Sequence, residues 1–337
     1  MFGRRLINTG GGGGSVNPYF NTVTYTGNGS TQSISGVGFQ PDFVWIKSRS
    51  AATNHKLTDI VRGTTKALVS NANAAETTDA NGLTAFGSNG FTLGSDSVYN
   101  NSGATYVAWC WKAGGAAVTN TSGSITSEVS ANVDAGFSVV KGNSGPEGPF
   151  TVGHALDAAP NLYIIRNASS DNGGEWYTYV ATLGANKYLR LNNPDEYVFN
   201  GLVWNNTNPT TTVFSMNSNV VITPNTNFIA YCFHSVAGFS KIGSYTGNGS
   251  ATGPTVTTDF EPAFVMIKRS NGTGNWVILD NKRDTSNPIN KTLKPSANAA
   301  ESTANDIDFN ATTFQLKSTN ADTNANGYNY IYMAFAN

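Results

Sequence analysis

The hexapeptide Tyr25-Thr26-Gly27-Asn28-Gly29-Ser30 recurs letter for letter as Tyr245-Thr246-Gly247-Asn248-Gly249-Ser250. Further segments behind each copy correspond at a nearly constant separation, from 220 residues (25 to 245) to 225 residues (73 to 298). They are Phe43-Val44-Trp45-Ile46-Lys47 with Phe264-Val265-Met266-Ile267-Lys268, Asn73-Ala74-Ala75-Glu76 with Asn298-Ala299-Ala300-Glu301, and Phe91-Thr92-Leu93 with Phe314-Gln315-Leu316. One unit therefore occurs twice in the chain, and a repeat of this kind decides the fold before any other pattern.

A third and weaker copy lies between these two. Pro160-Asn161-Leu162-Tyr163-Ile164-Ile165-Arg166 matches the segment that ends at Lys47. The segments that close the copies also match: Tyr106 to Trp111, Phe228 to Phe233 and Tyr330 to Phe335. We therefore predict three related modules within the usual size range of domains, at residues 20–115, 137–238 (the divergent copy) and 239–337.

Two further segments separate or precede the modules. Residues 1–19 contain an unbroken glycine run, Gly10 to Gly14, which does not hold a structure by itself. We interpret them as an N-terminal arm. Residues 116–136 are rich in Ser, Thr and Ala, and we interpret them as a linker.

The composition favours an all-β fold. Charged residues make up 12% of the chain, about half of the usual share, while aromatic residues reach 11%. Short apolar runs such as Phe43-Val44-Trp45-Ile46 are bounded by Gly, Asn and Pro, which is typical of strands. We predict three antiparallel β-sandwich modules in tandem, of a jelly-roll or lectin-like kind. The sequence leaves open whether each repeat closes its own sandwich or contributes to a shared one.

Charge and apolar content exclude several classes of partner. The net charge of −1 predicts no binding to nucleic acid, and no apolar run is long enough for membrane insertion. The N-terminus also lacks the apolar core of a secretory signal. Cys110 and Cys232 occupy a repeat position that Ala334 fills in the last copy. We therefore expect small buried packing sites there and no disulfide framework.

The charged candidates favour structural roles. Asp59 with Arg62, and Asp280 with Arg283, could bind a ligand or hold a strand end as an ion pair, and the second interpretation is favoured. Glu76 and Glu301, with Glu196 as a possible counterpart, occur one per module. That spacing does not suggest the paired carboxylates of a glycosidase.

No metal, cofactor or catalytic site is predicted. Asp306, Asp308 and Asn310 begin like a calcium-binding loop, but Ala311 and Lys317 stand where that loop requires Gly and Glu. We expect these residues on the wet face of a strand. The three histidines lie far apart in sequence, and no nucleophile elbow or phosphate loop occurs.

One repeat position suggests a ligand site. His55, Trp176 and Trp276 recur at one place in the module, after a polar loop. Exposed rings there would stack on a saccharide, whereas buried rings would pack against the sandwich. Packing is favoured, and the three residues remain the candidate ligand-binding residues.

The repeated signature resembles a module of tailed-phage virion proteins, most closely those of marine and cyanobacterial phages. It consists of the hexapeptide, the strand ending at Lys47, Asn275-Trp276, the stretch Ala300 to Thr303 and the ending Tyr106 to Lys112. The resemblance covers residues 20–337, and the middle module departs from the pattern where the others carry Asp59 and Arg62.

The resemblance implies a non-enzymatic virion structural protein, tail-fibre-like or exposed on the particle surface, attached through the N-terminal arm. The alternatives are a carbohydrate-binding adhesin for host attachment and a capsid decoration protein; a depolymerase is disfavoured because no acid pair is found. The implied partners are other virion proteins, further copies of the chain and a host-surface glycan. The implied location is the virion, assembled in the host cytoplasm.

Overall fold

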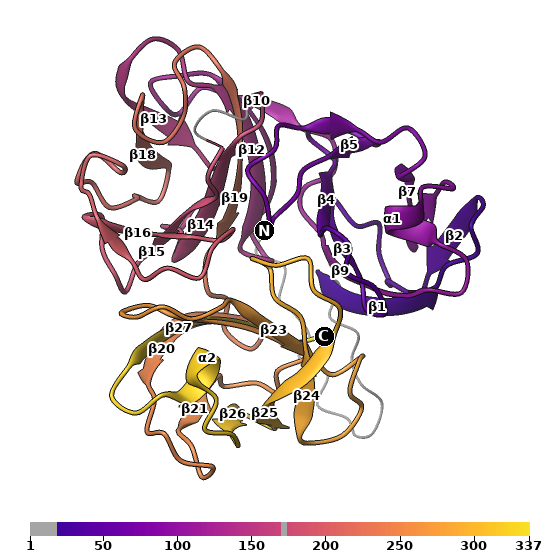
Figure 1. Ribbon diagram of the computed structural model, residues 1–337. Helices are drawn as coiled ribbons and strands as arrows, with labels where there is room; N and C mark the ends of the chain where they lie inside the picture. The colour runs from indigo at the N-terminus through magenta and orange to yellow at the C-terminus, as the bar shows by residue number, and fades with distance from the viewer. Residues whose placement is uncertain (1–18, 170–173) are drawn as a thin grey trace, which may run out of the picture.

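The computed structural model describes residues 19–169 and 174–337. The predicted arm of residues 1–19 lies outside the described residues, apart from Tyr19. The described chain consists of short strands and two single-turn helices, α1 (Ser97–Asn100) and α2 (Ala321–Asn324), which confirms the all-β prediction. Figure 1 shows three lobes around a common centre. Residues 20–111 form lobe 1, residues 118–233 lobe 2 and residues 240–335 lobe 3.

Lobe 1 contains an inner sheet, which faces the centre of the molecule, and an outer sheet. The inner sheet has the order β1 (Phe20–Thr26), β9 (Thr105–Trp111), β3 (Phe43–Ser48), β4 (Lys56–Asp59). The outer sheet has the order β2 (Gln32–Ser35), β8 (Gly90–Leu93), β7 (Leu83–Gly87). A short ladder joins β5 (Lys66–Ala67) and β6 (Thr77–Thr78).

Lobe 2 repeats this plan with a longer inner sheet. Its order includes β12 (Phe137–Asn143), β19 (Asn227–Phe233), β14 (Leu162–Asn167), β15 (Tyr177–Val180), β16 (Lys187–Arg190) and β17 (Val198–Phe199). The outer ladder pairs β13 (Gly148–Gly153) with β18 (Val213–Ser218).

The structure differs from the prediction of a linker at residues 116–136. β10 (Val118–Asn120) and β11 (Ser127–Asn132) lie in this range and extend the inner sheet of lobe 2 beyond β12. β11 pairs with β12 over its whole length, and Val129 opposite Val140 is buried in the lobe core. The polar composition is compatible with a strand because only one face of β11 needs apolar side chains.

Lobe 3 has the inner order β20 (Ser240–Thr246), β27 (Asn329–Phe335), β22 (Phe264–Arg269), β23 (Val277–Asp280). Its outer sheet has the order β21 (Thr255–Thr257), β26 (Thr313–Leu316), β25 (Ser302–Asn310), β24 (Ile289–Thr292). The four-strand inner order of lobe 1 thus recurs in lobes 2 and 3. The division into three separately folding modules stays a prediction.

The two central strands of each inner sheet are buried on both faces, so the repeats both close their own sandwiches and share a core. All six residues of β3 are buried. Val44 and Ile46 point into the core between the two sheets of lobe 1, whereas Phe43 and Trp45 point into a central core to which all three lobes contribute. This division follows from the alternation of side chains along a strand. Lobes 2 and 3 have equivalent cores of their own.

Three aromatic rings from equivalent strand ends meet in the central core. Trp111, Phe233 and Phe335 close β9, β19 and β27, and their ring centroids lie 5.8–6.3 Å apart in all three pairs. These are ordinary distances for tilted and edge-to-face aromatic contacts. Burial of each such side chain contributes roughly 1.5–3 kcal/mol to folding, so the shared core binds the lobes into one body.

The repeated hexapeptide forms a turn that closes lobe 1 and lobe 3. Tyr25 stacks on Tyr106 at 5.0 Å and donates a hydrogen bond to the carbonyl of Tyr99 within α1. The buried Asn100 amide donates to the carbonyl of Ser30. A Cβ atom at Gly27 would lie 2.3 Å from a backbone oxygen, so only glycine fits. Tyr245, Asn324 and Gly247 repeat these contacts in lobe 3.

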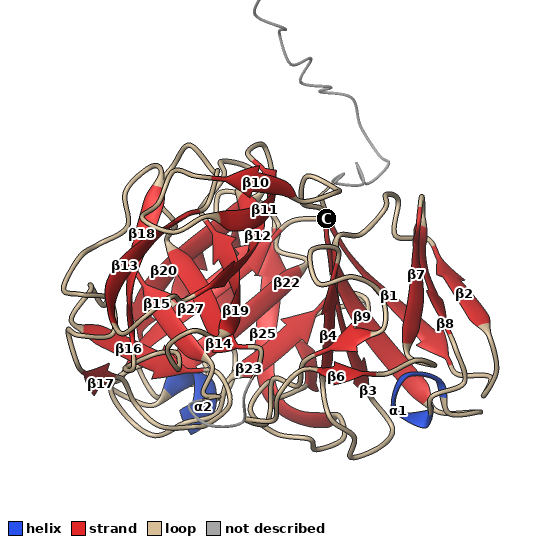
Figure 2. Ribbon diagram, turned by 90° about the horizontal axis from the view of Figure 1, so that it is seen from above, coloured by secondary structure: helices blue, strands red, loops and turns tan. Residues whose placement is uncertain are grey.

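The two ends of the body differ. Figure 2 shows α1 and α2 at one edge and the C-terminus at the opposite edge. Tyr19, the first described residue, packs edge-on against Phe239 at 5.9 Å, and the amide of Ala336 donates to the carbonyl of Phe239. The described chain therefore starts and finishes at the same end. No helix among the described residues is long and apolar enough to cross a membrane.

Candidate functional site between the lobes

The predicted ring position connects each lobe with a neighbour. Trp276 Nε1 donates to the carbonyl of Arg190 at 2.8 Å, and Trp176 Nε1 donates to that of Val69 at 2.8 Å. His55 Nε2 lies 3.0 Å from the carbonyl of Lys294. The three acceptors occupy equivalent positions. Each directly follows a leucine that pairs with the fourth inner strand of its lobe, and these leucines are Leu68, Leu189 and Leu293. The three bonds therefore close a ring: lobe 3 to lobe 2, lobe 2 to lobe 1, lobe 1 to lobe 3.

This geometry excludes the alternative in which these rings stack on a saccharide. The side chains of His55, Trp176 and Trp276 are all 0% exposed, and each belongs to or borders the central core. A sugar can stack only on a ring face that solvent reaches. The rings therefore pack, as the favoured interpretation predicted, and their recurrence in every copy reflects a contact between copies.

The hydrogen bonds of His55 define its tautomer. Trp45 Nε1, which can only donate, lies 2.9 Å from Nδ1 of His55. The proton is therefore on Nε2, where it faces the carbonyl of Lys294. Burial lowers the pKa of His55 to about 3, so the ring is neutral and structural near pH 7.

The charged pairs also lie at contacts between lobes. Arg62 Nε donates to Asp59 at 2.6 Å, and Tyr231 of lobe 2 donates its hydroxyl to the same carboxylate at 2.9 Å. In lobe 3, Arg283 Nε donates to Asp280 at 2.6 Å, and Trp109 Nε1 of lobe 1 donates to that carboxylate at 3.0 Å. Each ion pair is thus completed by a donor from the next lobe.

Between lobes 2 and 3, the place that an ion pair takes at the other two lobe contacts is apolar. Register places Val180 and Leu183 of lobe 2 where lobe 1 has Asp59 and Arg62. The residue of lobe 3 equivalent to Tyr231 and Trp109 is Met333, which has no polar hydrogen to donate. Val180 and Met333 lie in the central core, with Leu183 packed against it. The donor and the ion pair therefore occur together or are absent together, which favours a structural lock over a ligand site.

Buried cations at one repeat position were missed by the sequence analysis. Lys47, Arg166 and Lys268 close equivalent strands and are 0% exposed. Arg166 donates to the carbonyls of Ala72 and Ala74 in lobe 1, and Lys268 donates to that of Pro194 in lobe 2. Burial lowers the pKa of Lys268 to about 7 and that of Lys47 to about 8. The signal was a cation that ends an otherwise apolar strand in all three copies.

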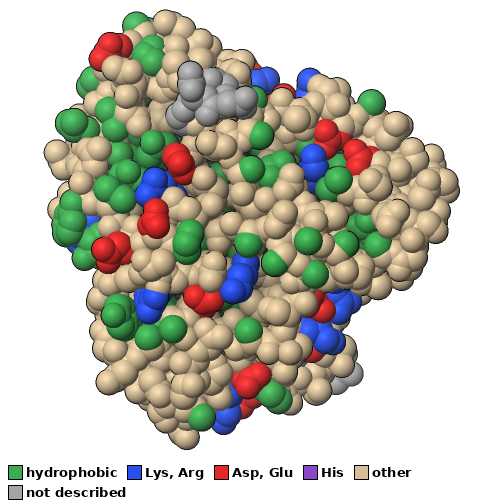
Figure 3. All heavy atoms as spheres, in the orientation of Figure 1, with side chains coloured by type: hydrophobic (Ala, Val, Ile, Leu, Met, Phe, Trp, Pro, Cys, Tyr) green, Lys and Arg blue, Asp and Glu red, His purple; other side chains and the backbone are tan. Residues whose placement is uncertain are grey.

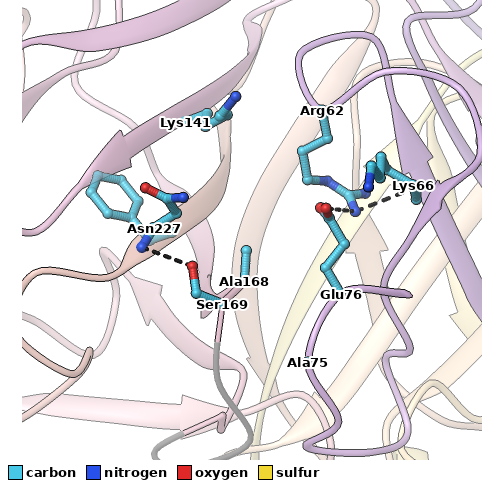
Figure 4. Close-up of a pocket in the computed structure, with 9 residues that line it drawn as sticks. Arg62, Lys66, Ala75, Glu76, Lys141, Ala168, Ser169 and Asn227 are labelled. Carbon is cyan, nitrogen blue, oxygen red and sulfur yellow. Dashed lines mark hydrogen bonds and ion pairs between the residues drawn. The ribbon is translucent and has the colours of Figure 1, made fainter. Parts of the chain in front are cut away.

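A cleft opens between lobes 1 and 2, and Figure 4 shows its lining. It has a volume of about 360 Å³ and is lined mainly by charged and amide side chains. Glu76 accepts from Arg62 at 3.2 Å, and Lys66 donates to Thr78. The lining residues are Arg62, Lys66, Ala75, Glu76, Lys141, Ala168, Ser169, Asn227 and Phe228.

An equivalent cleft of about 400 Å³ opens between lobes 2 and 3. Leu183, Lys187, Tyr197 and Asn329 occupy the places of Arg62, Lys66, Glu76 and Asn227. Between lobes 3 and 1, Arg49 fills the equivalent space. Its guanidinium makes a bidentate ion pair with Glu301, and both hydrogen bonds are 2.9 Å long. The pseudo-threefold arrangement therefore offers two clefts with different linings.

The structure also places the predicted glutamates. The amides of Glu76 and Glu301 donate to the carbonyls of Ala168 and Arg49 in the neighbouring lobe. In lobe 2 the amide that makes this bond belongs to Tyr197, which donates to the carbonyl of Ser270, so Tyr197 and not Glu196 is the counterpart. The carboxylate of Glu76 accepts a hydrogen bond from Arg62, and that of Glu301 accepts one from Arg283. Both glutamates therefore belong to the contacts between lobes.

The acidic run in lobe 3 lies on one face of β25. Ile307 and Phe309 are buried, whereas Asp306, Asp308 and Asn310 alternate with them on the wetter face. Asp308 lies 3.6 Å from Lys317 as an ion pair. The predicted alternation is therefore confirmed. Among residues 19–169 and 174–337, no group of three His, Cys, Asp or Glu side chains could hold a metal ion.

The two cysteines are buried packing residues. Cys110 and Cys232 are free thiols within the cores of lobes 1 and 2. Burial raises the pKa of both thiols, which keeps them protonated and unreactive. Ala334 lies in the core of lobe 3 at the same place in its strand, as predicted for a small buried side chain.

Comparison with known proteins gives a family but no activity. Residues 15–337 match a family described as "Domain of unknown function (DUF7483)". No curated protein matches the chain significantly. The match spans all three lobes, in agreement with their shared core. The chain therefore belongs to the DUF7483 domain family.

Proposed function

We propose that the chain is a non-enzymatic structural protein of a bacteriophage particle, tail-fibre-like or otherwise exposed on the particle surface. The N-terminal arm of residues 1–19 attaches it. Its partners are other virion proteins and further copies of the chain, and its location is the virion. The sequence resemblance suggests this role, and the relation between the chain ends and the loops is the observation that carries it.

The body is suited to a rigid part of a particle. The central strands of the inner sheets are buried on both faces, and hydrogen bonds from His55, Trp176 and Trp276 link the three lobes in a closed ring. Opening one lobe would expose its share of the central core and break these bonds. A body held together in this way is rigid from one end to the other.

The chain ends and the loops are disposed as attachment requires. Tyr19 and Ala336 meet at Phe239, and Figure 2 places the C-terminus at the edge opposite α1 and α2. An arm that begins at this end leaves the loops beside α1 and α2 pointing away from the point of attachment. Loops on a rigid scaffold are where proteins usually present binding surfaces. Figure 3 shows charges of both signs interspersed on the face viewed along the centre, as on an ordinary exposed surface.

The proposal is tested on particles of the phage that encodes the chain. Antibodies against residues 19–337 should label gradient-purified particles, and mass spectrometry should detect the chain in them at a constant stoichiometry. A chain recovered only from the lysate and never with particles would refute the proposal.

The arm is tested separately. A chain lacking residues 1–18 should unfold at the same urea concentration as the full chain and fail to enter particles. Leu202→Ala, an exposed substitution on lobe 2, should incorporate normally. Normal incorporation of the shortened chain would show that attachment does not use the arm.

A further inference from the structure

The cleft between lobes 2 and 3 carries an aromatic pair at its rim. Tyr197 lines the cleft, and Phe199 meets it edge-to-face at 5.2 Å with an interplanar angle of 90°. Phe199 is 66% exposed, the largest such value among the large apolar side chains described. An exposed ring beside a cleft offers a flat apolar surface without being part of any core.

One cation lies against this pair. The ammonium of Lys187 lies 5.0 Å from the ring centre of Tyr197 and 4.9 Å from that of Phe199. Among the described residues, no carboxylate lies within ion-pair distance of it, and it is the only charged side chain that lines this cleft. The cleft therefore has one positive charge with no protein counter-ion.

The fold does not require a ring at the position of Phe199. Phe199 pairs with Lys187 across β16 and β17, as Thr78 pairs with Lys66 across β5 and β6. Thr78 therefore fills the same backbone place in lobe 1. Tyr197 stands in the place of Glu76 of the other cleft, and its ring also packs against the central core. Because a threonine suffices for the ladder, the exposed ring of Phe199 is available to a ligand.

The opposite wall of the cleft supplies hydrogen-bonding groups. Ser244 and Thr246 are exposed on β20, and Asn329 is exposed at the start of β27. Thr246 donates to Oδ1 of Asn329, and no protein acceptor among the described residues takes the hydrogens of the Asn329 side-chain amide. The wall thus offers the Asn329 side-chain amide and the Ser244 hydroxyl as donors, and the Thr246 hydroxyl as an acceptor.

We propose that this cleft binds an acidic saccharide, a pyranoside that carries a carboxylate. The C–H face of the sugar ring packs on Phe199, and its carboxylate pairs with Lys187. Its hydroxyl groups hydrogen-bond with Ser244, Thr246 and Asn329. Uronic and sialic acids combine a flat apolar ring face, one negative charge and several hydroxyl groups. These features correspond to Phe199, to Lys187 and to the polar wall of the cleft.

The site is independent of the proposed particle location, because it rests only on the lining of the cleft and on Phe199 at its rim. It also differs from the other cleft. There the place of the exposed ring is taken by Thr78, whose hydroxyl accepts from Lys66, the counterpart of Lys187.

The test uses the full chain and defined oligosaccharides. Saturation-transfer NMR and calorimetric titration would compare tetrasaccharides of hyaluronan, alginate and α2,8-linked sialic acid with neutral chitotetraose. At least one acidic tetrasaccharide should bind with millimolar or lower Kd, and the neutral one at least about fivefold more weakly. Absence of binding by all three acidic compounds at 10 mM would overturn the proposal, as would equal binding of chitotetraose.

Variants locate the site. Phe199→Ala and Lys187→Met should each weaken binding of the acidic tetrasaccharide by at least about fivefold. Leu202→Ala removes another exposed apolar side chain of lobe 2, and Thr78→Ala alters the equivalent place in the other cleft. Both controls should bind within twofold of the unmodified chain. Binding that survives Phe199→Ala and Lys187→Met unchanged would show that the saccharide sits elsewhere and refute the assignment.

Discussion

Replacing Asp59 by Val tests whether the ion pairs lock the lobes together. The Asp59 side chain is fully buried and accepts hydrogen bonds from Arg62 Nε at 2.6 Å and from the Tyr231 hydroxyl at 2.9 Å. Its removal leaves the guanidinium of Arg62 buried with only Glu76 as a charged partner. Breaking a buried pair from one side costs about 3–5 kcal/mol, so Asp59→Val should lower the free energy of unfolding by that amount.

The contact between lobes 2 and 3 shows which further substitutions would compensate for the loss of Asp59. At the equivalent place lobe 2 has Val180 and Leu183, and the facing residue is Met333. There the turn amide of Leu183 donates to the carbonyl of Val180, so no carboxylate is needed to hold the turn. The triple variant Asp59→Val, Arg62→Leu, Tyr231→Phe copies this apolar contact. It should unfold within about 2 kcal/mol of the unmodified chain, because removing all members of a buried polar group is often close to neutral.

Urea unfolding followed by tryptophan fluorescence and by circular dichroism measures both variants. The shared core predicts a single transition with coincident signals. A loss below about 1 kcal/mol for Asp59→Val would show that the pair does not lock the lobes. A triple variant no more stable than the single variant would show that the charges do more than satisfy one another.

Three further outcomes are expected. Trp276→Ala should cost about 3–5 kcal/mol in urea unfolding, whereas the exposed Phe199→Ala should cost less than about 0.5 kcal/mol; equal losses would contradict the burial of Trp276. Burial holds the pKa of His55 at about 3, below the unfolded value of about 6.5, so the unfolded chain binds a proton that the folded chain does not. Stability should therefore fall as pH decreases from about 6.5 toward 3. His55→Gln should remove that part of the slope, which urea midpoints at pH 7 and pH 5 would measure. Because burial raises the pKa of the Cys110 and Cys232 thiols, Ellman's reagent at pH 8 should label neither before unfolding, and fast labelling of the native chain would show that a thiol is accessible.

The sequence predicted much of the fold because local chemistry governs it. Short apolar runs between Gly and Asn turns predicted strands, and the strands follow these runs in all three copies. The hexapeptide that defined the repeat forms the same turn in both of its copies. The error at residues 116–136 had the opposite cause. A Ser-rich strand near the edge of a sheet, such as β11, has too few apolar residues to be distinguished from a linker.

The candidate site was less predictable. The ring position was found because His55, Trp176 and Trp276 recur, but recurrence identifies a position and not its environment. Both exposed stacking and buried packing were consistent with it. The neighbours that decide between them lie in another copy; for Trp276 the acceptor is Arg190, 86 residues earlier in the chain.

The sequence by itself determined that the chain is all-β and internally repeated, because strand patterning and turn chemistry act over a few residues. Only the tertiary structure decided how the copies meet, because contacts between copies depend on the order of the lobes around their common centre, and no spacing along the chain records that order. The same closure decided that Tyr231 completes the Asp59 pair, that Met333 faces Val180, and that Phe199 and Asn329 border one cleft.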